Sequence, residues 1–477
     1  MSRSLSYLSF PPKRVKLNDS VETVEKLMDS FQQSRIEHST DKCDSRRIRV
    51  LSSMCQSVND NKLDGGIVYW MSRDSRVQDN WAMIYAQELA NAHNLPLYVI
   101  FCLPKRFLNA SLRQFHFLIE GLKLIHEECK QLNITFVVLN GSGDEILVDW
   151  VKKYNIAGIV CDFNPLRIVR RWTARVKTQL PPDVYFVQVD AHNIVPCWVA
   201  SDKQESSADS MRSKLKTNMK TFLKPFPLVI KHSIDSKARI DPATCDKIDW
   251  NDLLESRDAD KSVGPVTWAQ AGYTNACVAL AEFIDNNLWH YKETRNDVNA
   301  DSQSNMSPWY HFGHISVQRV VWYLIIAKMK HFESNVESYI EECFVRRELA
   351  DNFCYYNINY DRFDNAPNNL HLNKKQHCYN RKELDNAKTH DKLWNDAQTQ
   401  LKGQGRMHGH VRMYWAKKIS EWSISPTAAL INAIHFNDKY SLDGCDPNGY
   451  AGCLWSICGT TIEPKLSDNT IHEHYKK

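Results

Sequence analysis

Five short runs of β-branched and aromatic residues alternate with helix-length segments, and this alternation constrains the fold more than any other feature of the sequence. The runs are IVYW (67–70), LYVIF (97–101), TFVVL (135–139), GIVCD (158–162) and VYFVQVD (184–190). The segments between them, such as 79–93 and 111–132, carry apolar residues at helical spacing. Because apolar strands that alternate with helices form parallel sheets, the pattern predicts a doubly wound α/β domain over residues 63–199.

The turn after the first predicted strand reads MSRDSRVQDN (71–80) and contains no glycine. The GxGxxG fingerprint, in which glycines let the backbone approach a pyrophosphate, is therefore absent. The expected domain is Rossmann-like in its sheet but not in its first turn, which disfavours a nicotinamide-dependent dehydrogenase.

The chain of 477 residues is too long for one ordinary core. Residues 1–62 are rich in Ser, Asp, Lys and Arg, which predicts a disordered polar tail. Within it, PPKRVKLND (11–19) resembles a nuclear import signal and predicts a nuclear protein. The alternative is that this basic cluster is only part of a solvated tail.

The sequence changes character after the predicted sheet. Residues 200–262 are polar and predict a linker between domains. From 263 to 459 apolar residues recur at helical spacing, which predicts a large all-helical domain. Residues 460–477 form a short polar tail.

Composition excludes several classes of protein but does not select one. The net charge of +4 is too small to argue for nucleic-acid binding on its own. The 14 cysteines include no CxxC pair, which predicts reduced cysteines in an intracellular protein and no metal site. The longest apolar run, VVWYLIIA (320–327), is far shorter than the ~20 residues of a membrane span.

Several long strings resemble one known family. They are MSPWYHFGHIS (306–316), RRELADNFCYYN (346–357), AKTHDKLWNDAQ (387–398), RMHGHVRMYWAKKISEW (406–422) and NDKYSLDGCDPNGYAGCLWSICG (437–459). Together with VYWMSRDSRVQDNWA (68–82), they resemble class II cyclobutane pyrimidine dimer DNA photolyases. The resemblance covers about residues 65–459. It implies an α/β domain followed by a helical domain that binds FAD, which is active in its reduced form.

The resemblance implies a set of flavin-binding residues. They are Tyr291, Gln303, Ser304, Asn305, Met306, Ser307, Arg412, Asn437 and Asp443. Arg412 and Asp443 match a pair beside the isoalloxazine ring, and Asn437 matches the residue that faces its N5 atom. Taken alone, the hydroxyl residues before Pro308 favour an ordinary helix cap, and only the resemblance favours the flavin.

Trp415 and Trp422 are two helical turns apart, so they share one face of a helix. Spacing alone favours core packing. The resemblance instead implies a relay that passes electrons to the photoexcited flavin. In that relay Trp415 is nearest the flavin, Trp394 is the outer donor and Trp422 is a side branch.

The resemblance also implies contacts to the DNA lesion. Glu342 matches an acidic residue that bonds the dimer, Met413 and Trp455 match apolar walls of the pocket, and Arg295 and Asn296 match contacts to the lesion or its backbone. Glu341 is a neighbouring alternative. Glu342 is also spaced to pair with Arg346 on a helix.

The chain departs from the family at a few positions. Cys445 and His410 stand where Arg and an aromatic residue are usual, and 365–377 replaces a stretch that normally carries a tryptophan. The tail after Gly459 replaces a segment that supplies further contacts to the lesion strand, so we expect a weaker grip on DNA.

The sequence thus predicts light-driven repair of cyclobutane pyrimidine dimers by electron transfer from photoexcited reduced FAD. The predicted partner is dimer-containing DNA, bound by a monomer. A second, light-harvesting chromophore in the α/β domain is compatible with the resemblance, and the sequence does not identify it. The alternatives are a cryptochrome-like flavin light sensor and an isoform that lacks repair activity.

Overall fold

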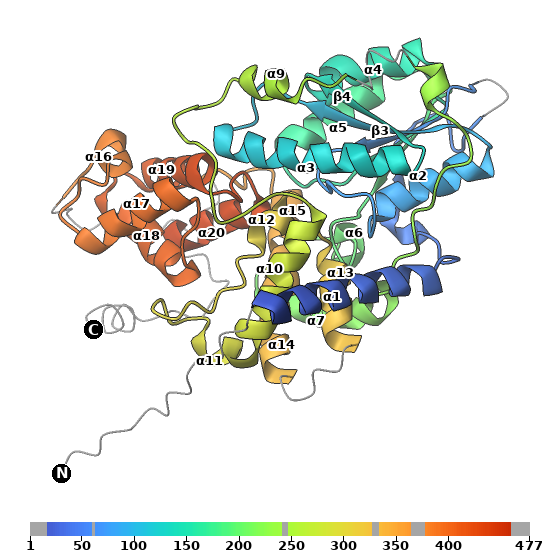
Figure 1. Ribbon diagram of the computed structural model, residues 1–477. Helices are drawn as coiled ribbons and strands as arrows, with labels where there is room; N and C mark the ends of the chain where they lie inside the picture. Colours follow the sequence, from blue (N-terminus) through green and yellow to red (C-terminus); the bar gives the residue numbers. More distant parts are fainter. Residues whose placement is uncertain (1–16, 60–62, 241–246, 327–332, 364–376, 459–477) are drawn as a thin grey trace.

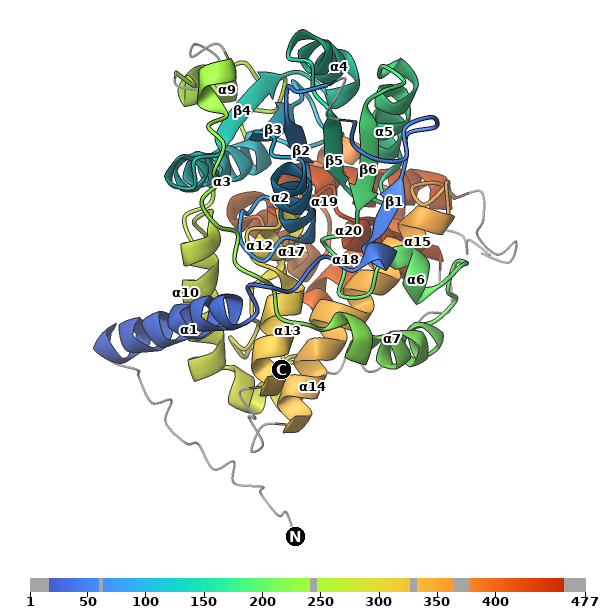
Figure 2. The same ribbon diagram turned by 90° about the vertical axis from the view of Figure 1, so that its right-hand side faces the viewer.

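The computed structural model describes residues 17–59, 63–240, 247–326, 333–363 and 377–458 (Figure 1). The predicted tail 460–477, most of the basic cluster 11–19 and most of the replaced segment 365–377 lie outside these ranges. The chain forms an α/β domain and a larger helical region packed against it (Figures 1 and 2).

A six-stranded sheet forms the centre of the α/β domain. Its strands are β1 (Ile48–Val50), β2 (Ile67–Met71), β3 (Leu97–Leu103), β4 (Thr135–Asn140), β5 (Gly158–Asp162) and β6 (Tyr185–Val189). They lie in the order β1-β6-β5-β2-β3-β4, and all neighbours are parallel except β1, which runs antiparallel to β6. The five predicted strands are thus confirmed as a doubly wound sheet.

Helices cover both faces of the sheet. They are α2 (Trp81–Ala92), α3 (Leu112–Gln131), α4 (Gly143–Lys153) and α5 (Arg167–Gln179). Alternate residues of each strand enter opposite cores: Tyr69 packs with α2 and α3, whereas Val68 packs with α4 and α5. The strands are buried on both faces, which explains their continuous apolar runs.

The prediction of a disordered tail over 1–62 is wrong for its described part. Helix α1 (Leu17–Glu37) lies against α10 (Tyr273–Asn286) of the helical region (Figure 2). Its Arg35 is buried and donates to Asp79 of the α/β domain at 2.6 Å. A short η1 (Ser45–Arg47) leads into the edge strand β1. The segment is polar in composition because it contains charged residues such as Arg35, whose partners are buried in the fold. Its composition therefore did not indicate that it is folded.

The polar linker is partly helical. It follows α6 (Cys197–Ala200) and contains α7 (Ala208–Phe222), η2 (Lys237–Arg239) and α9 (Trp250–Glu255). Helix α7 inserts Met211 and Leu215 into the same core as α10 and α13.

The helical region has two cores. Its elements are α10 (Tyr273–Asn286), η3 (Leu288–His290), α11 (Tyr291–Thr294), α12 (Ser307–His311), α13 (Val317–Ile326), α14 (Glu333–Ile340), the π-helix η5 (Glu341–Arg346), α15 (Arg347–Tyr356), α16 (Arg381–Asp385), α17 (Lys392–Gln404), α18 (Gly409–Trp422), α19 (Pro426–Tyr440) and α20 (Pro447–Cys458). One core gathers α1, α7 and α10–α14, and the other gathers α15–α20. The predicted helical domain after residue 263 is confirmed.

Candidate functional site

A cavity of about 670 Å³ opens among α11, η5, α18 and α20. Most of the predicted site residues line it: Tyr291, Arg295, Asn296, Gln303, Ser304, Ser307, Glu342, Arg412, Met413, Trp415 and Asp443. A second hollow of about 330 Å³ shares five of these residues and adds Asn305 and Met306. The two spaces share lining residues, and we call them together the large cavity.

The wall before α12 is built by local turns. Asn305 adopts a left-handed backbone with φ of 52°, and the Ser304 hydroxyl accepts the Met306 N–H. The Ser307 hydroxyl donates to Asp443 at 2.5 Å. Asp443 is thereby held between Ser307 and Arg412, whose Nη2 lies 3.9 Å from its carboxylate.

The Arg412 side chain is only partly buried. Its side chain is 33% exposed and its ion pair with Asp443 is long. Because water still reaches the guanidinium of Arg412, the charge does not need a carboxylate partner to offset lost hydration. The guanidinium lines both parts of the large cavity, where its donors are available to a ligand.

The π-helix η5 settles which of two neighbouring glutamates faces the cavity. Glu342 accepts a hydrogen bond from Arg295 at 2.5 Å and lines the cavity. Glu341 instead bonds Arg212 of α7 at 2.7 Å and Arg346 at 3.3 Å. The expected Glu342–Arg346 pair is replaced by Glu341–Arg346, because a π turn shifts the register by one residue.

These contacts change the pKa values of the paired groups. Burial lowers the pKa of Arg295, but the charge of Glu342 outweighs it and raises the value above the ordinary one. Burial raises the pKa of Glu341, yet Arg212 and Arg346 lower it overall. Arg295 and Glu341 are therefore charged at neutral pH, and Glu342 sits beside a permanent cation.

The three predicted relay tryptophans form a continuous row. The rings of Trp415 and Trp394 are parallel, with centroids 6.5 Å apart and 2° between planes, and Trp394 lies 5.6 Å from Trp422. Trp415 lines the large cavity. Trp394 is fully buried and packs against both of the other rings, and its role as the outer donor stays a prediction.

The row continues toward the surface. Trp422 packs 5.5 Å from Tyr379, which is partly exposed. The Tyr379 hydroxyl bonds Nδ1 of His390 at 2.7 Å. Trp422 therefore lies between Trp394 and Tyr379, and its role as a side branch stays a prediction.

Glycines leave room for a flat ring in the large cavity. Gly409 and Gly452 line it, and a Cβ added at either would meet no atom within 4 Å. Tyr310 and Trp415 add aromatic wall. A planar cofactor such as an isoalloxazine therefore fits the residues present.

Two of the predicted flavin- and lesion-binding residues do not line the cavity. Asn437 is buried behind Gly449, with its amide nitrogen 2.5 Å from where a Cβ on that glycine would lie. Its amide also donates to Asp438 at 3.3 Å. Trp455 packs 6.3 Å from Phe353, and its indole nitrogen has no hydrogen-bond partner in the described ranges.

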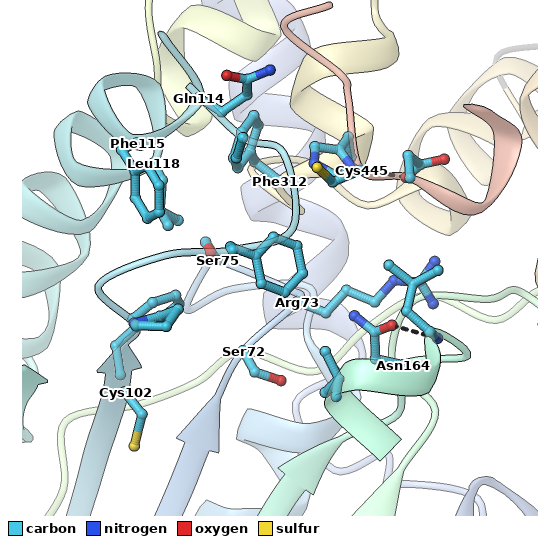
Figure 3. A pocket seen from close by; sticks show the side chains of 18 of the residues that line it. Ser72, Arg73, Ser75, Cys102, Gln114, Phe115, Leu118, Asn164, Phe312 and Cys445 are labelled. Atoms are coloured by element: carbon cyan, nitrogen blue, oxygen red, sulfur yellow. Dashed lines mark hydrogen bonds and ion pairs between the residues drawn. The ribbon is translucent and has the colours of Figure 1, made fainter. Parts of the chain in front are cut away.

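A second pocket of about 110 Å³ lies where the α/β domain meets the helical region (Figure 3), and we call it the junction pocket. Phe115 and Leu118 of α3 face it from one side, and Phe312 and Cys445 bound it from the helical side (Figure 3). It opens at the carboxyl ends of β2 and β3, where doubly wound sheets bind ligands.

The charges at the junction pocket are already paired. Arg73 donates to both carboxylate oxygens of Asp351, at 2.7 and 2.8 Å. His311 bonds Asp446 at 2.7 Å. Burial raises the pKa of Asp446, but His311 outweighs it and holds the value well below the ordinary range. The pocket therefore presents aromatic rings and neutralised polar groups.

Comparisons with known proteins identify the family. A model of the DNA photolyase family matches residues 67–231. A deoxyribodipyrimidine photo-lyase of Potorous tridactylus is 47% identical over 424 residues, which are 87% of this chain and 77% of that protein. The chain belongs to the DNA photolyase family. This confirms the resemblance and the expectation of a photolyase enzyme.

Other photolyases agree with this assignment. A deoxyribodipyrimidine photo-lyase of Oryza sativa subsp. japonica is 40% identical, covering 83% of this chain and 81% of that one. Among solved structures, a bacterial class III photolyase from Agrobacterium tumefaciens aligns with a TM-score of 0.61 at 17% identity, over 87% of this chain and 82% of that one. That likeness shows the fold alone.

The described part of this photolyase contains no cluster of three or more His, Cys, Asp or Glu residues that could hold a metal ion. No helix within the described ranges is long and apolar enough to cross a membrane. None of the twelve cysteines in the described ranges forms a disulfide bond with another described residue.

Sequence reasoning missed several residues of this photolyase site. Arg212 lies about 130 positions before its partner Glu341, and the aromatic walls of the junction pocket come from separate segments. His408, which contacts Gln303 at 3.1 Å, was visible only as part of the string at 406–422. Local patterns do not reveal such long-range pairs.

Proposed function

We propose that this chain repairs cyclobutane pyrimidine dimers in DNA, using light absorbed by reduced FAD held in the large cavity. The observation that carries the proposal is the meeting of Glu342, Arg295 and Trp415 at one glycine-lined cavity. Bound FAD would supply the photoexcited electron that splits the cyclobutane ring.

Several residues of the chain are suited to hold the cofactor. Ser304, Asn305 and Ser307 offer hydroxyl, amide and backbone donors along the narrower part of the cavity. Arg412 adds a cation that can balance the charge of a reduced flavin or a phosphate. Gly449 of α20 lies directly against the Asn437 amide. The proposed role of Asn437 beside N5 therefore depends on the absence of a side chain at position 449.

Other residues of the cavity wall are suited to two linked pyrimidines of one strand that have left the DNA stack. Met413 gives an apolar contact, and the Glu342–Arg295 pair gives hydrogen bonds for the edges of the flipped bases. In its protonated form, Glu342 would donate a hydrogen bond to a carbonyl oxygen of the dimer and so stabilise the dimer while it carries an extra electron. Asn296 lines the same cavity and would contact the flanking backbone. Trp455 has no place in this contact set as the chain is arranged here.

The tryptophan row would serve to reduce oxidised flavin and would take no part in the repair step itself. Trp415 borders the cavity and would give an electron to oxidised flavin, and Trp394 and Trp422 would refill it in turn. Their burial keeps water from the intermediate steps.

The junction pocket is suited to a light-harvesting chromophore. Its walls include Trp70, Phe107 and Trp172, against which a flat aromatic molecule can stack. Because Arg73 and His311 are already paired, the pocket favours a ring system over a multiply charged ligand.

We propose that the enzyme acts as a monomer on DNA. The nuclear import signal at 11–19 stays a prediction from the sequence. A cryptochrome-like sensor would use the same tryptophan row, but it would have no need of the Glu342–Arg295 pair on the cavity wall.

The test is to purify the full chain, record its flavin spectrum and illuminate it with a dimer-containing oligonucleotide. Loss of dimers in light but not in darkness supports repair. Photoreduction of flavin without dimer loss would favour the sensor or the repair-deficient isoform. Absence of any flavin would contradict the proposal.

A further inference from the structure

Gln398 is the side chain that holds the indole of Trp415. It lies on α17, one turn after Trp394, and is completely buried. Its side-chain oxygen accepts the Trp415 indole N–H at 2.8 Å. An indole nitrogen can only donate, so this contact fixes which end of the amide faces the ring.

The other end of the same amide has no partner. The Gln398 side-chain nitrogen is buried and makes no hydrogen bond with the described residues. An unmatched buried donor is costly, so a site that serves only packing would favour an apolar residue. Position 398 nevertheless carries a glutamine, and only the side-chain oxygen of this glutamine is hydrogen-bonded.

The second indole of the stacked pair is bonded in the same manner. The Trp394 N–H donates to the backbone carbonyl of Trp415 at 3.0 Å. Both N–H groups of the pair therefore end on amide oxygens, which accept hydrogen bonds but do not take up protons at neutral pH. Farther along the row the Tyr379 hydroxyl meets an imidazole nitrogen of His390, Nδ1, and not an amide oxygen.

This difference decides where a proton can leave. When Trp415 gives one electron to the photoexcited oxidised flavin, it becomes a radical cation whose N–H is far more acidic than before. A base at that position would take the proton and trap the oxidation on Trp415. With an amide oxygen there, the proton stays, and an electron from Trp394 restores neutral Trp415 with its N–H intact.

We infer that Gln398 is a positioning residue of the relay, which orients Trp415 and keeps the proton on its oxidised indole so that the oxidation moves on to Trp394. The inference rests on the proposed role of the tryptophan row.

The experiment is transient absorption after a light pulse, on the full chain loaded with oxidised flavin. Gln398→Met deletes the acceptor at similar size, and the yield of oxidised tryptophan should fall about two- to tenfold, the factor of one neutral hydrogen bond. Gln398→Glu at pH 9 places a carboxylate at the indole, and the spectrum of the deprotonated, neutral tryptophan radical should appear before the oxidation leaves Trp415.

A second measurement needs no flavin. The indole N–H resonance of Trp415 in the NMR spectrum should shift in Gln398→Met and stay in place in Gln404→Met, a matched change at an exposed position of the same helix. Because the two Gln398 variants alter the site differently, either one that folds tests the inference.

The outcomes separate the inference from the proposed function. A shifted resonance with unchanged radical yield and spectrum in both variants would make Gln398 a packing residue and overturn the inference. If Trp415→Phe retains photoreduction, the relay itself is wrong and the inference falls with it. Loss of photoreduction in Trp415→Phe together with altered radicals at Gln398 supports both.

Discussion

The large cavity and the junction pocket differ in how exposed their charged side chains are. At the junction pocket, Arg73 and its partner Asp351 are both almost completely buried and bonded to each other. In the large cavity, Arg295 and Arg412 are about one third exposed, and their ion pairs border open space. Charges that are already neutralised suit a chromophore that only absorbs light, whereas accessible charges can act on a reacting molecule.

The largest expected effect comes from filling the large cavity. Gly452→Phe places a ring where a Cβ meets no atom within 4 Å, so flavin should be excluded. The purified variant should show almost no flavin absorbance and no repair. Gly403→Phe is the control, because Gly403 is equally open but lies outside both cavities. Normal flavin content in Gly452→Phe would show that the cofactor lies elsewhere.

Asp438 is buried next to the junction pocket and should make stability depend on pH. It accepts hydrogen bonds from the N–H of Cys445, which lines that pocket, and from the Asn437 amide. Burial raises the pKa of Asp438 to about 6. The folded state therefore holds this proton more tightly than the unfolded chain does, and the resulting stability, present below about pH 4, is lost as the pH rises through about 6.

Asp438→Asn removes this titration without changing the shape of the side chain. Relative to the unmodified chain, the variant should gain about 3 kcal/mol in free energy of unfolding between pH 4 and pH 7. Denaturant unfolding at both pH values measures the difference. A difference that stays constant with pH would mean that the carboxyl ionises normally.

Glu342→Gln probes the accessible charge in the large cavity. It keeps the shape but removes the charged hydrogen bond with Arg295, so light-driven repair should fall about tenfold or more while flavin content is unchanged. Glu341→Gln is the matched control, since Glu341 bonds Arg212 and does not line the cavity. Equal losses in both variants would indicate that the π-helix, and not Glu342 itself, is what matters.

Filling the junction pocket should have the smallest effect. Ala110→Trp occupies space beside Phe107 and Phe115, so a second chromophore should be excluded. Repair by chemically reduced enzyme at flavin wavelengths should stay normal, and only other wavelengths of the action spectrum should lose efficiency. Ala92→Trp, at an exposed position of α2, is the control. A loss of repair at all wavelengths would place chemistry in the junction pocket.

The sequence predicted what depends on local periodicity. The strands from Ile67 to Val189 were readable because both of their faces are buried. Strand β1, only three residues long, and α1, whose Arg35 is neutralised by a distant Asp79, carry no such local signal. Tertiary pairing outweighs local composition at these two elements.

The site was predictable in its membership but not in its arrangement. The identity of Trp394 followed from the resemblance, yet its central place between Trp415 and Trp422 depends on how α17 packs on α18. The choice of Glu342 over Glu341 depends on a π turn, which no helical period predicts. Such features arise from packing between distant segments.

The most direct test asks whether Trp415 is needed for photoreduction of the flavin but not for dimer repair. In Trp415→Phe, photoreduction of oxidised flavin should be lost, because the row then no longer reaches the cavity. Dimer repair by the same variant should continue once its flavin is reduced chemically. Photoreduction that survives, or repair that fails with flavin bound and reduced, would contradict the division of tasks proposed for this cavity.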